Sequence, residues 1–297
     1  MYFYLEWLDK RPSKIQLVNE KPPELTFESK FKIKQKEYII CGNINPNFKP
    51  YIVSKPLIYR KNQYLLSHLQ KSIRRMETIK SVQTAKHLID LDCNSFLRRL
   101  PIIMIEDVTL HSSFPVIIWL MIAYSKKMVL KNEIIKWLLG VVYYISTCDK
   151  KTYYEKEKNT LDINGNNDII INSLRFRKAY GGMNGDMEMI EYYTQLVNSK
   201  KLNIDNGKII PIKKIDPLKK REWIYESNDF HCNRYIIKKI GFKYPEYNDE
   251  EIKKLIWIFS SSYNIREIQT SKPKGEIEKW DKIKDTVKKV QKECIYY

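Results

Sequence analysis

Residues 65–124 contain the stretch that decides the fold, which reads LLSHLQKSIRRM (65–76), TAKHLIDLD (84–92), FLRRLPIIMIEDV (96–108) and FPVIIWLMIAY (114–124). Apolar residues recur here at spacings of three and four, the period of a helix that buries one face. The pairs Arg98-Arg99 and Glu106-Asp107 stand inside these apolar segments. Because an unpaired buried charge costs several kcal/mol, we expect the two pairs to meet in a polar seam between packed helices.

The polar seam, defined as Arg98, Arg99, Glu106 and Asp107, has a second interpretation. Its two carboxylates could serve as metal ligands of a nuclease, but the sequence offers no identifiable third acidic partner. We favour ion pairing with an arginine and predict no metal site. On that basis Arg99→Ala or Glu106→Ala should unfold the protein or dissolve an oligomer, whereas Lys71→Ala should leave stability nearly unchanged.

Basic residues strongly outnumber acidic ones. The 297 residues include 53 Lys and Arg against 35 Asp and Glu, a formal net charge of +18. A surplus of this size favours polyanionic partners, above all nucleic acid, although an AT-rich genome also enriches lysine. A lysine-rich helix expected at 279–292 offers one basic surface. We predict contact with DNA or RNA phosphates chiefly through basic residues of two other segments: Lys71, Arg74, Arg75, Arg175, Arg177 and Lys178.

The cysteines and the apolar runs are typical of an intracellular protein. Its five cysteines are far apart and form no CxxC pair, which argues against a disulfide scaffold and against a four-thiolate zinc site. The sequence shows no N-terminal signal segment, and its longest apolar run, residues 114–124, is too short to span a bilayer. We expect a location in the cytoplasm, the nucleus or a viral replication site, and no membrane partner.

The pattern along the chain predicts a mainly α-helical protein, a helical bundle-like body with a small N-terminal β element. We divide it into a β-rich element, a helical domain, a linker or surface loop, and a second helical region, at residues 1–60, 61–148, 149–168 and 169–297. Strands are expected within residues 26–42 and 51–53, and a hairpin-like turn at Asn206-Gly207.

Helices are expected throughout the rest of the chain. Pro101 should end or kink one helix, or lie in the first turn of the next. From Glu276 the apolar residues follow nearly a heptad spacing, and we expect this C-terminal amphipathic helix to dock on the body rather than on a second copy. Other helices are predicted at about residues 115–126, 131–147, 168–179, 186–198, 229–240 and 249–262.

The segment YGGMNGDM, residues 180–187, concentrates three of the nine glycines. Its residues Tyr180, Gly181, Gly182 and Gly185 precede a helix, so their backbone amides could cradle a phosphate. Asp186 would repel an anion there, and we favour a structural turn. No GxxxxGK[ST] loop occurs anywhere in the sequence, so we predict no nucleotide or other cofactor.

The segment NDFHCN brings Asp229, His231 and Cys232 together in the sequence. These residue types could ligate a metal or form a Cys–His pair. Adjacent residues of a helix point about 100° apart, so His231 and Cys232 cannot easily share one ion. We favour a structural histidine, with Asp229 capping the helix that follows.

Part of the chain is similar to a known family. The run Leu69-Gln70-Lys71-Ser72-Ile73-Arg74, the alanine-bearing segment 85–92, and the element Arg98-Arg99-Leu100 followed by Ile105-Glu106-Asp107-Val108 together resemble the C-terminal helical domain of the RarA/MgsA family. The resemblance covers residues 65–110. It implies a helical oligomerisation domain that works beside an AAA+ ATPase at stalled replication forks. The motor motifs of that family are absent from this sequence.

The composition favours a basic protein that binds nucleic acid, and the resemblance implies a non-catalytic accessory or assembly factor of DNA replication or repair. We expect it to bind nucleic acid, to meet replication proteins and to self-associate as a homo-oligomer. One alternative is a viral structural or nucleic-acid-packaging protein. Another is a metal-dependent enzyme of nucleic-acid metabolism that uses the carboxylates Glu106, Asp107, Asp186 and Asp229.

Overall fold

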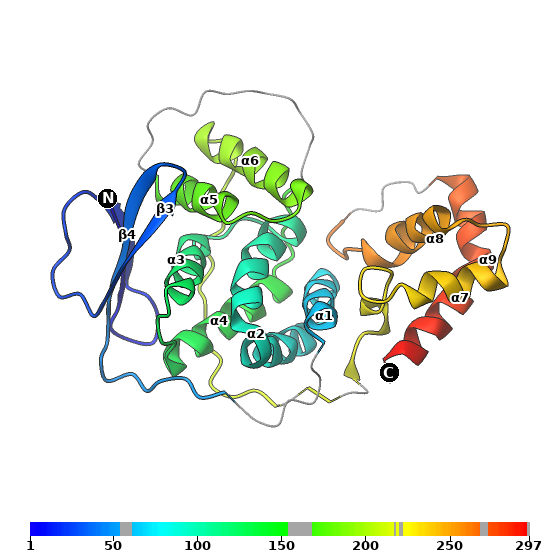
Figure 1. Cartoon of the computed structure of the whole chain (residues 1–297), viewed down its shortest axis with the longest axis horizontal. Helices are drawn as coiled ribbons and strands as arrows, with labels where there is room; N and C mark the ends of the chain where they lie inside the picture. The colour runs from blue at the N-terminus through cyan, green and yellow to red at the C-terminus, as the bar shows by residue number, and fades with distance from the viewer. Residues whose placement is uncertain (54–60, 154–167, 217, 220–221, 268–272, 296–297) are drawn as a thin grey trace. The chain divides into compact units, whose positions relative to one another are not determined.

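A computed structural model describes residues 1–53, 61–153, 168–216, 218–219, 222–267 and 273–295 (Figure 1). The protein is 54% helical, and its described residues form nine α-helices and one four-stranded sheet near the N-terminus. The predicted mainly α-helical fold with an N-terminal β element is confirmed. Within the same residues, none of the helices has the length and apolar character needed to cross a bilayer.

Contacts divide the chain into two units, which differ from the four consecutive segments that we expected. Unit 1 comprises Met1–Ser54, Cys93–Ile145 and Lys150–Lys214. Unit 2 comprises Lys55–Asp92, Ser146–Asp149 and Ile215–Tyr297. The expected linker 149–168 is described only at its ends, and its residues 154–167 lie outside the described part of the chain.

The sheet of unit 1 has the strand order β2-β1-β4-β3. Strand β1 pairs antiparallel with β2 and parallel with β4, and β3 and β4 form an antiparallel hairpin. The bounds are Tyr2–Trp7 for β1, Lys14–Val18 for β2, Phe27–Ile33 for β3 and Lys36–Ile44 for β4. The prediction placed strands only within 26–42, where β3 and β4 form, and within 51–53. Strands β1 and β2 were missed, and no strand forms at 51–53, although the preceding Pro50 makes an isolated bridge to Lys131.

Helix α3, Phe114–Ser125, packs against the sheet through Trp119. The Trp119 indole Nε1 donates hydrogen bonds to the backbone oxygens of Phe3 at 2.9 Å and Cys41 at 3.0 Å. A Cβ added at Gly42 would lie 2.9 Å from the Trp119 ring, so this close approach of helix and strand requires glycine at position 42.

Helices α4, Asn132–Thr147, α5, Ile169–Ala179, and α6, Asn184–Asn198, match the predicted helices closely. Trp137 of α4 packs edge-on against Trp7 of β1, with ring centroids 5.3 Å apart. Residues 203–213 contain no strand, which corrects the hairpin predicted at Asn206-Gly207. This segment lies along α4 instead, because a Cβ at Gly207 would lie 1.9 Å from the Tyr144 hydroxyl.

Helix α2, Thr78–Asp107, is interrupted at Asp92, where φ is −155° and ψ is 81°. The boundary between the two units falls at this kink. Pro101 lies inside the second half of the helix, so the expectation that it ends one helix or starts the next is wrong. The Asn62 amide donates a 2.7 Å hydrogen bond to the Asp92 carboxylate, which holds the kink to the start of α1, Asn62–Arg74.

Unit 2 has its own apolar core. Helix α9, Lys274–Cys294, packs with α7, Tyr235–Lys243, and α8, Asp249–Ile256. The predicted docking of this helix on the body is confirmed, since its heptad-spaced residues Ile283, Val287, Val290 and Cys294 are all buried there. Helix α7 begins later than expected, and α8 continues into a π-helical turn, η3, Trp257–Ser261. A short 3-10 turn, η2, spans Tyr225–Ser227.

Candidate nucleic-acid-binding site

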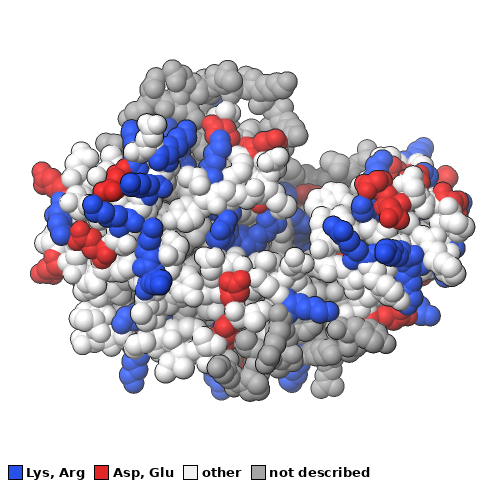
Figure 2. Space-filling model, in the orientation of Figure 1, with Lys and Arg blue, Asp and Glu red and all other residues white. Residues whose placement is uncertain are grey.

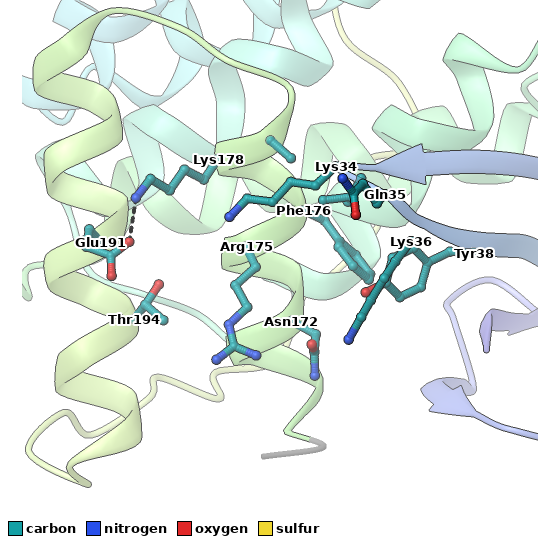
Figure 3. A pocket seen from close by; sticks show the side chains of 12 residues that line it. Lys34, Gln35, Lys36, Tyr38, Asn172, Arg175, Phe176, Lys178, Glu191 and Thr194 are labelled. Atoms are coloured by element: carbon teal, nitrogen blue, oxygen red, sulfur yellow. Dashed lines mark hydrogen bonds and ion pairs between the residues drawn. The ribbon is translucent and has the colours of Figure 1, made fainter. Parts of the chain in front are cut away.

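A concave surface with basic walls lies in unit 1, between the β3–β4 hairpin and helices α5 and α6 (Figure 3). Its volume is about 890 Å³. We call it the basic pocket, and it is lined by Ile33, Lys34, Gln35, Lys36, Tyr38, Asn172, Arg175, Phe176, Lys178, Ala179, Glu191 and Thr194.

Local structure sets the two walls of the basic pocket. Ile33 pairs with Lys36 at the end of the hairpin, so Lys34 and Gln35 form a two-residue turn. On α5 the lining residues Asn172, Arg175, Phe176 and Ala179 recur at spacings of three and four, which places them on one helix face. The side chain of Asp168 caps this helix by accepting from the amide of Ile170 at 2.7 Å.

The inner wall of the basic pocket is aromatic. Phe176 is 2% exposed, and its ring lies 5.1 Å from that of Tyr38 and 5.5 Å from that of Phe31. Tyr38 is half-buried and stacks on Phe31 at 5.4 Å with an interplanar angle of 25°. The Tyr38 ring is therefore held in place from two sides.

The rim is cationic. Four basic side chains face one carboxylate, Glu191, which binds Lys178 at 2.6 Å. Within the described residues, neither Lys34 nor Lys36 has an acidic partner. Figure 3 shows the Lys34 side chain extending from the hairpin toward Arg175 and Lys178. Over the region of this hairpin and α5, Lys and Arg predominate on the molecular surface, with a few carboxylates between them (Figure 2).

The six residues predicted to bind phosphates differ in where they lie: some line the basic pocket, and the others are buried or half-buried. Arg175 and Lys178 line the basic pocket. Lys71, Arg74 and Arg177 are buried, at 6%, 5% and 3% exposure, which corrects their assignment to a binding surface. Arg75 is half-buried, and its guanidinium donates to the backbone oxygen of Ser260 at 3.0 Å.

The buried basic residues bind protein groups. Lys71 forms an ion pair with Asp229, with Nζ 2.6 Å from Oδ2. Arg74 donates to the backbone oxygen of Ser261 at 2.7 Å, at the end of η3. Arg177 donates to the backbone oxygens of Arg98 and Gly181, at 3.1 and 2.8 Å. Burial, and then the neighbouring Arg98, lower the pKa of Arg177 to about 10.

The glycine segment is a structural turn. Its carbonyls accept hydrogen bonds from arginines, since Arg98 donates to the Tyr180 oxygen at 2.9 Å and Arg177 to the Gly181 oxygen. Gly181 has a φ of +72°, a conformation that glycine adopts without strain. Gly182 belongs to the turn, whereas Gly185 lies in the first turn of α6, and Asp186 forms an ion pair with Arg99. These contacts agree with the structural turn that we favoured over a phosphate-binding loop for this segment.

The polar seam forms in part as predicted. Arg99 binds Glu106 at 3.5 Å, and it also binds Asp186 at 3.2 Å, a partner that the sequence did not reveal. Arg98 instead contacts the glycine turn, and Asp107 is 2% exposed. Two of the four carboxylates proposed for an enzyme are therefore engaged by one arginine.

Asp229, His231 and Cys232 do not converge on a common point. Asp229 is fully buried and accepts from Lys71, from Ser261 Oγ at 2.6 Å and from the backbone amide of His231 at 2.9 Å. The His231 side chain is 52% exposed, and its ring lies against those of Phe230 and Trp257. Cys232 Sγ donates to the oxygen of Gln63. Asp229 closes the 229–233 turn rather than capping α7, which begins at Tyr235. Across the described chain, His, Cys, Asp and Glu form no cluster of three that could hold a metal.

Sequence reasoning missed Lys34, Lys36 and Tyr38. A signal was available, because KFKIKQK has a lysine at every second position from Lys30 to Lys36, followed by an aromatic residue. Such alternation places lysines on one face of a strand. Comparison with known protein families, with curated proteins and with solved structures finds no match for this chain.

Replacement of Arg99 by alanine tests the polar seam. The variant should lower the free energy of unfolding by about 2 kcal/mol, because two carboxylates lose their partner. This is less than the cost at a fully buried site, since the Arg99 and Glu106 side chains are 20% and 29% exposed. Urea denaturation measures the loss.

The exposed Arg11 provides a matched control, and Arg11→Ala should change the free energy of unfolding by no more than about 0.5 kcal/mol. If Glu106→Ala is as stable as the wild type or more stable, the structural account of the seam fails. A carboxylate that can be removed at no cost to stability would point to a functional role.

Proposed function

We propose that this chain is a non-catalytic, basic accessory factor of DNA replication or repair that binds nucleic acid through its basic pocket. Its helices would form a bundle-like body that self-associates and meets replication proteins. The observation that carries the proposal is the pocket rim, where Lys34 and Lys36 have no acidic partner within the described residues. The net charge of +18 supports the same class of partner.

The backbone at the hairpin turn adds a second argument. Lys34 has a φ of +52°, the left-handed region that costs a side-chain-bearing residue roughly 1 kcal/mol or more. Asparagine or glycine would suit this turn better, so local structure does not account for a lysine here. The presence of Lys34 at a strained position, near Lys36 and Arg175, supports a role in anion binding.

The carboxylates support a binding role over the enzyme alternative. Glu106 and Asp186 both bind Arg99, and Asp229 binds Lys71. Asp229 belongs to unit 2 and the other acidic candidates to unit 1. The link to replication and repair comes from the resemblance of residues 65–110 to the RarA/MgsA family, a stretch that divides between the two units at Asp92.

A charge-removal experiment tests the proposal. The triple variant Lys34→Asn/Lys36→Gln/Arg175→Gln should bind short oligo(dT) at least about tenfold more weakly at a salt concentration on the order of 0.1 M. Its affinity should also depend less steeply on the salt concentration. Each lost phosphate contact reduces the log–log salt slope by about 0.7 for a single strand. Fluorescence anisotropy over a salt series measures both quantities.

The matched control removes the same number of positive charges from α9, as Lys282→Gln/Lys288→Gln/Lys289→Gln. These residues are exposed and lie on the other basic surface noted in the sequence. The control should retain nearly all of the affinity. An equal loss in both triple variants, or no binding by the wild type at low salt, would overturn the proposal. Thermal melts establish that both variants fold, and Lys34→Asn should not destabilise the protein because asparagine tolerates a positive φ.

A further inference from the structure

The basic pocket has two chemically different parts, and a duplex would use only one of them. The backbone of a double helix presents phosphates outward and keeps its bases stacked inside, so it would meet the lysines of the rim. The aromatic wall, Tyr38 and Phe176, would gain nothing from such a partner. A ligand that satisfies both parts carries phosphates and a flat apolar group that is free to enter.

The aromatic wall is suited to receive a planar ring. Tyr38 is only half-buried, whereas Phe31 behind it and Phe176 beside it are 2% exposed. These contacts fix the orientation of the Tyr38 ring before any ligand arrives, so little side-chain entropy remains to be lost on binding. Figure 3 shows Tyr38 and Phe176 together on the inner side of the lysines of the hairpin.

The size of the basic pocket agrees with such a ligand. Its volume of about 890 Å³ falls in the range of sites that enclose a drug-sized molecule, which is the size class of one nucleotide. Lys34 and Lys36 line the basic pocket from the hairpin, and Arg175 lines it from α5. Cations on both sides of the opening can contact the phosphates that precede and follow an inserted base.

We propose that the basic pocket binds single-stranded nucleic acid by taking in one unstacked base against Tyr38 and Phe176, while Lys34, Lys36 and Arg175 hold the flanking phosphates. This inference rests on the proposed nucleic-acid binding and specifies its substrate as a single strand. Aromatic stacking of this kind is tolerant of sequence, because every base has a π-face.

The first test uses the wild-type protein alone. Anisotropy measurements compare three probes of equal length: oligo(dT), the same backbone with abasic sites throughout, and a blunt duplex. Oligo(dT) should bind about tenfold more tightly than the abasic strand, which keeps the phosphates but lacks the bases. Equal affinity for oligo(dT) and the abasic strand would overturn this inference and leave phosphate binding intact. Binding of none of the three probes would overturn the proposed function itself.

The second test changes the wall. Tyr38→Leu should weaken oligo(dT) binding about tenfold and leave duplex binding within about twofold, whereas Tyr38→Phe keeps the ring and should bind as the wild type does. Tyr143→Leu removes another partly exposed tyrosine of unit 1 and should change neither affinity. Equal loss for the single strand and the duplex in Tyr38→Leu would contradict base insertion. The abasic comparison decides the question if Tyr38→Leu fails to fold.

Discussion

Lys71→Met should lower the free energy of unfolding of unit 2 by about 3–5 kcal/mol, the cost of leaving a buried charge without its partner. The side chains of Lys71 and Asp229 are 7% and 0% exposed, and their charged atoms lie 2.6 Å apart. Burial would raise the pKa of the Asp229 carboxyl, but the Lys71 ammonium outweighs it and holds that pKa below its usual range. Asp229 therefore stays ionised at neutral pH, and methionine would leave its charge with hydroxyl and amide donors alone.

Urea denaturation followed by circular dichroism measures this loss as a lower transition midpoint with an unchanged slope. Lys284→Met is the matched control, because it breaks an exposed pair with Asp281 whose side chains are 39% and 54% exposed. That variant should lose at most about 0.5 kcal/mol. The double variant Lys71→Met/Asp229→Leu should recover much of the stability, since apolar residues of similar volume replace both charges. Wild-type stability of Lys71→Met would show that the buried pair contributes nothing.

The sequence suggested that substitution of Arg99 would destabilise the protein more than substitution of Lys71, and the structure predicts the opposite order. Lys71 lies close to Arg74 and Arg75 in the sequence. A basic run of this kind on a helix is typical of a solvated or phosphate-binding face. The partner of Lys71, Asp229, lies 158 residues further along the chain, so no local pattern connects them. The seam residue Arg99 was expected to be the more sensitive position, yet its side chain keeps 20% of its exposure.

Helices were predictable where a local pattern determined them. Nearly continuous apolar runs predicted α3 and α4 almost to their ends, and residues 114–123 of α3 are indeed all buried. The apolar spacing of three and four residues predicted α9, because that helix buries a face that the sequence itself displays. Strand β1 was not predicted, since Tyr2–Trp7 has three consecutive buried residues, Phe3, Tyr4 and Leu5, and therefore no alternation of apolar and polar positions. Its partner β4 pairs from a distant part of the chain, and only the fold reveals that pairing.

Only part of the candidate site was predictable from the sequence, because its residues come from two distant segments of the chain. Arg175 and Lys178 drew attention as basic residues before a glycine turn, and they do line the basic pocket. Lys34, Lys36 and Tyr38 complete it from a hairpin near the N-terminus, and neither element alone has a concave surface. Charge can be read from a sequence, whereas the aromatic wall behind the charge depends on tertiary packing.

His68 should make unit 2 sensitive to mild acid. Its ring lies on α1 and is 0% exposed, and it links three segments of unit 2. Nε2 accepts a hydrogen bond from the backbone amide of Ile224 at 2.8 Å, and Nδ1 lies 2.7 Å from Thr84 Oγ1. The Thr84 hydroxyl donates to the backbone oxygen of Lys80, so Nδ1 carries the proton and the ring is neutral. Protonation of Nε2 would break the bond to Ile224.

Burial, followed by the charges of Lys80 and Lys71, lowers the pKa of His68 to about 3. The unfolded chain therefore binds a proton at this residue below about pH 6.5, while the folded protein does not. The stability that this group contributes is fully present above pH 6.5 and is lost as the pH falls from 6.5 toward 3. Between pH 7 and pH 5 the loss should be about 2 kcal/mol, measured by urea denaturation at the two pH values.

His68→Gln isolates this contribution, because an amide can still accept from Ile224 and donate to Thr84 but does not titrate. The decrease in unfolding free energy from pH 7 to pH 5 should be about 2 kcal/mol smaller in this variant than in the wild type. His111, whose pKa burial also lowers, is present in both proteins and cancels from the difference. Parallel pH profiles for His68→Gln and the wild type would show that a neutral buried His68 is not what limits stability in acid.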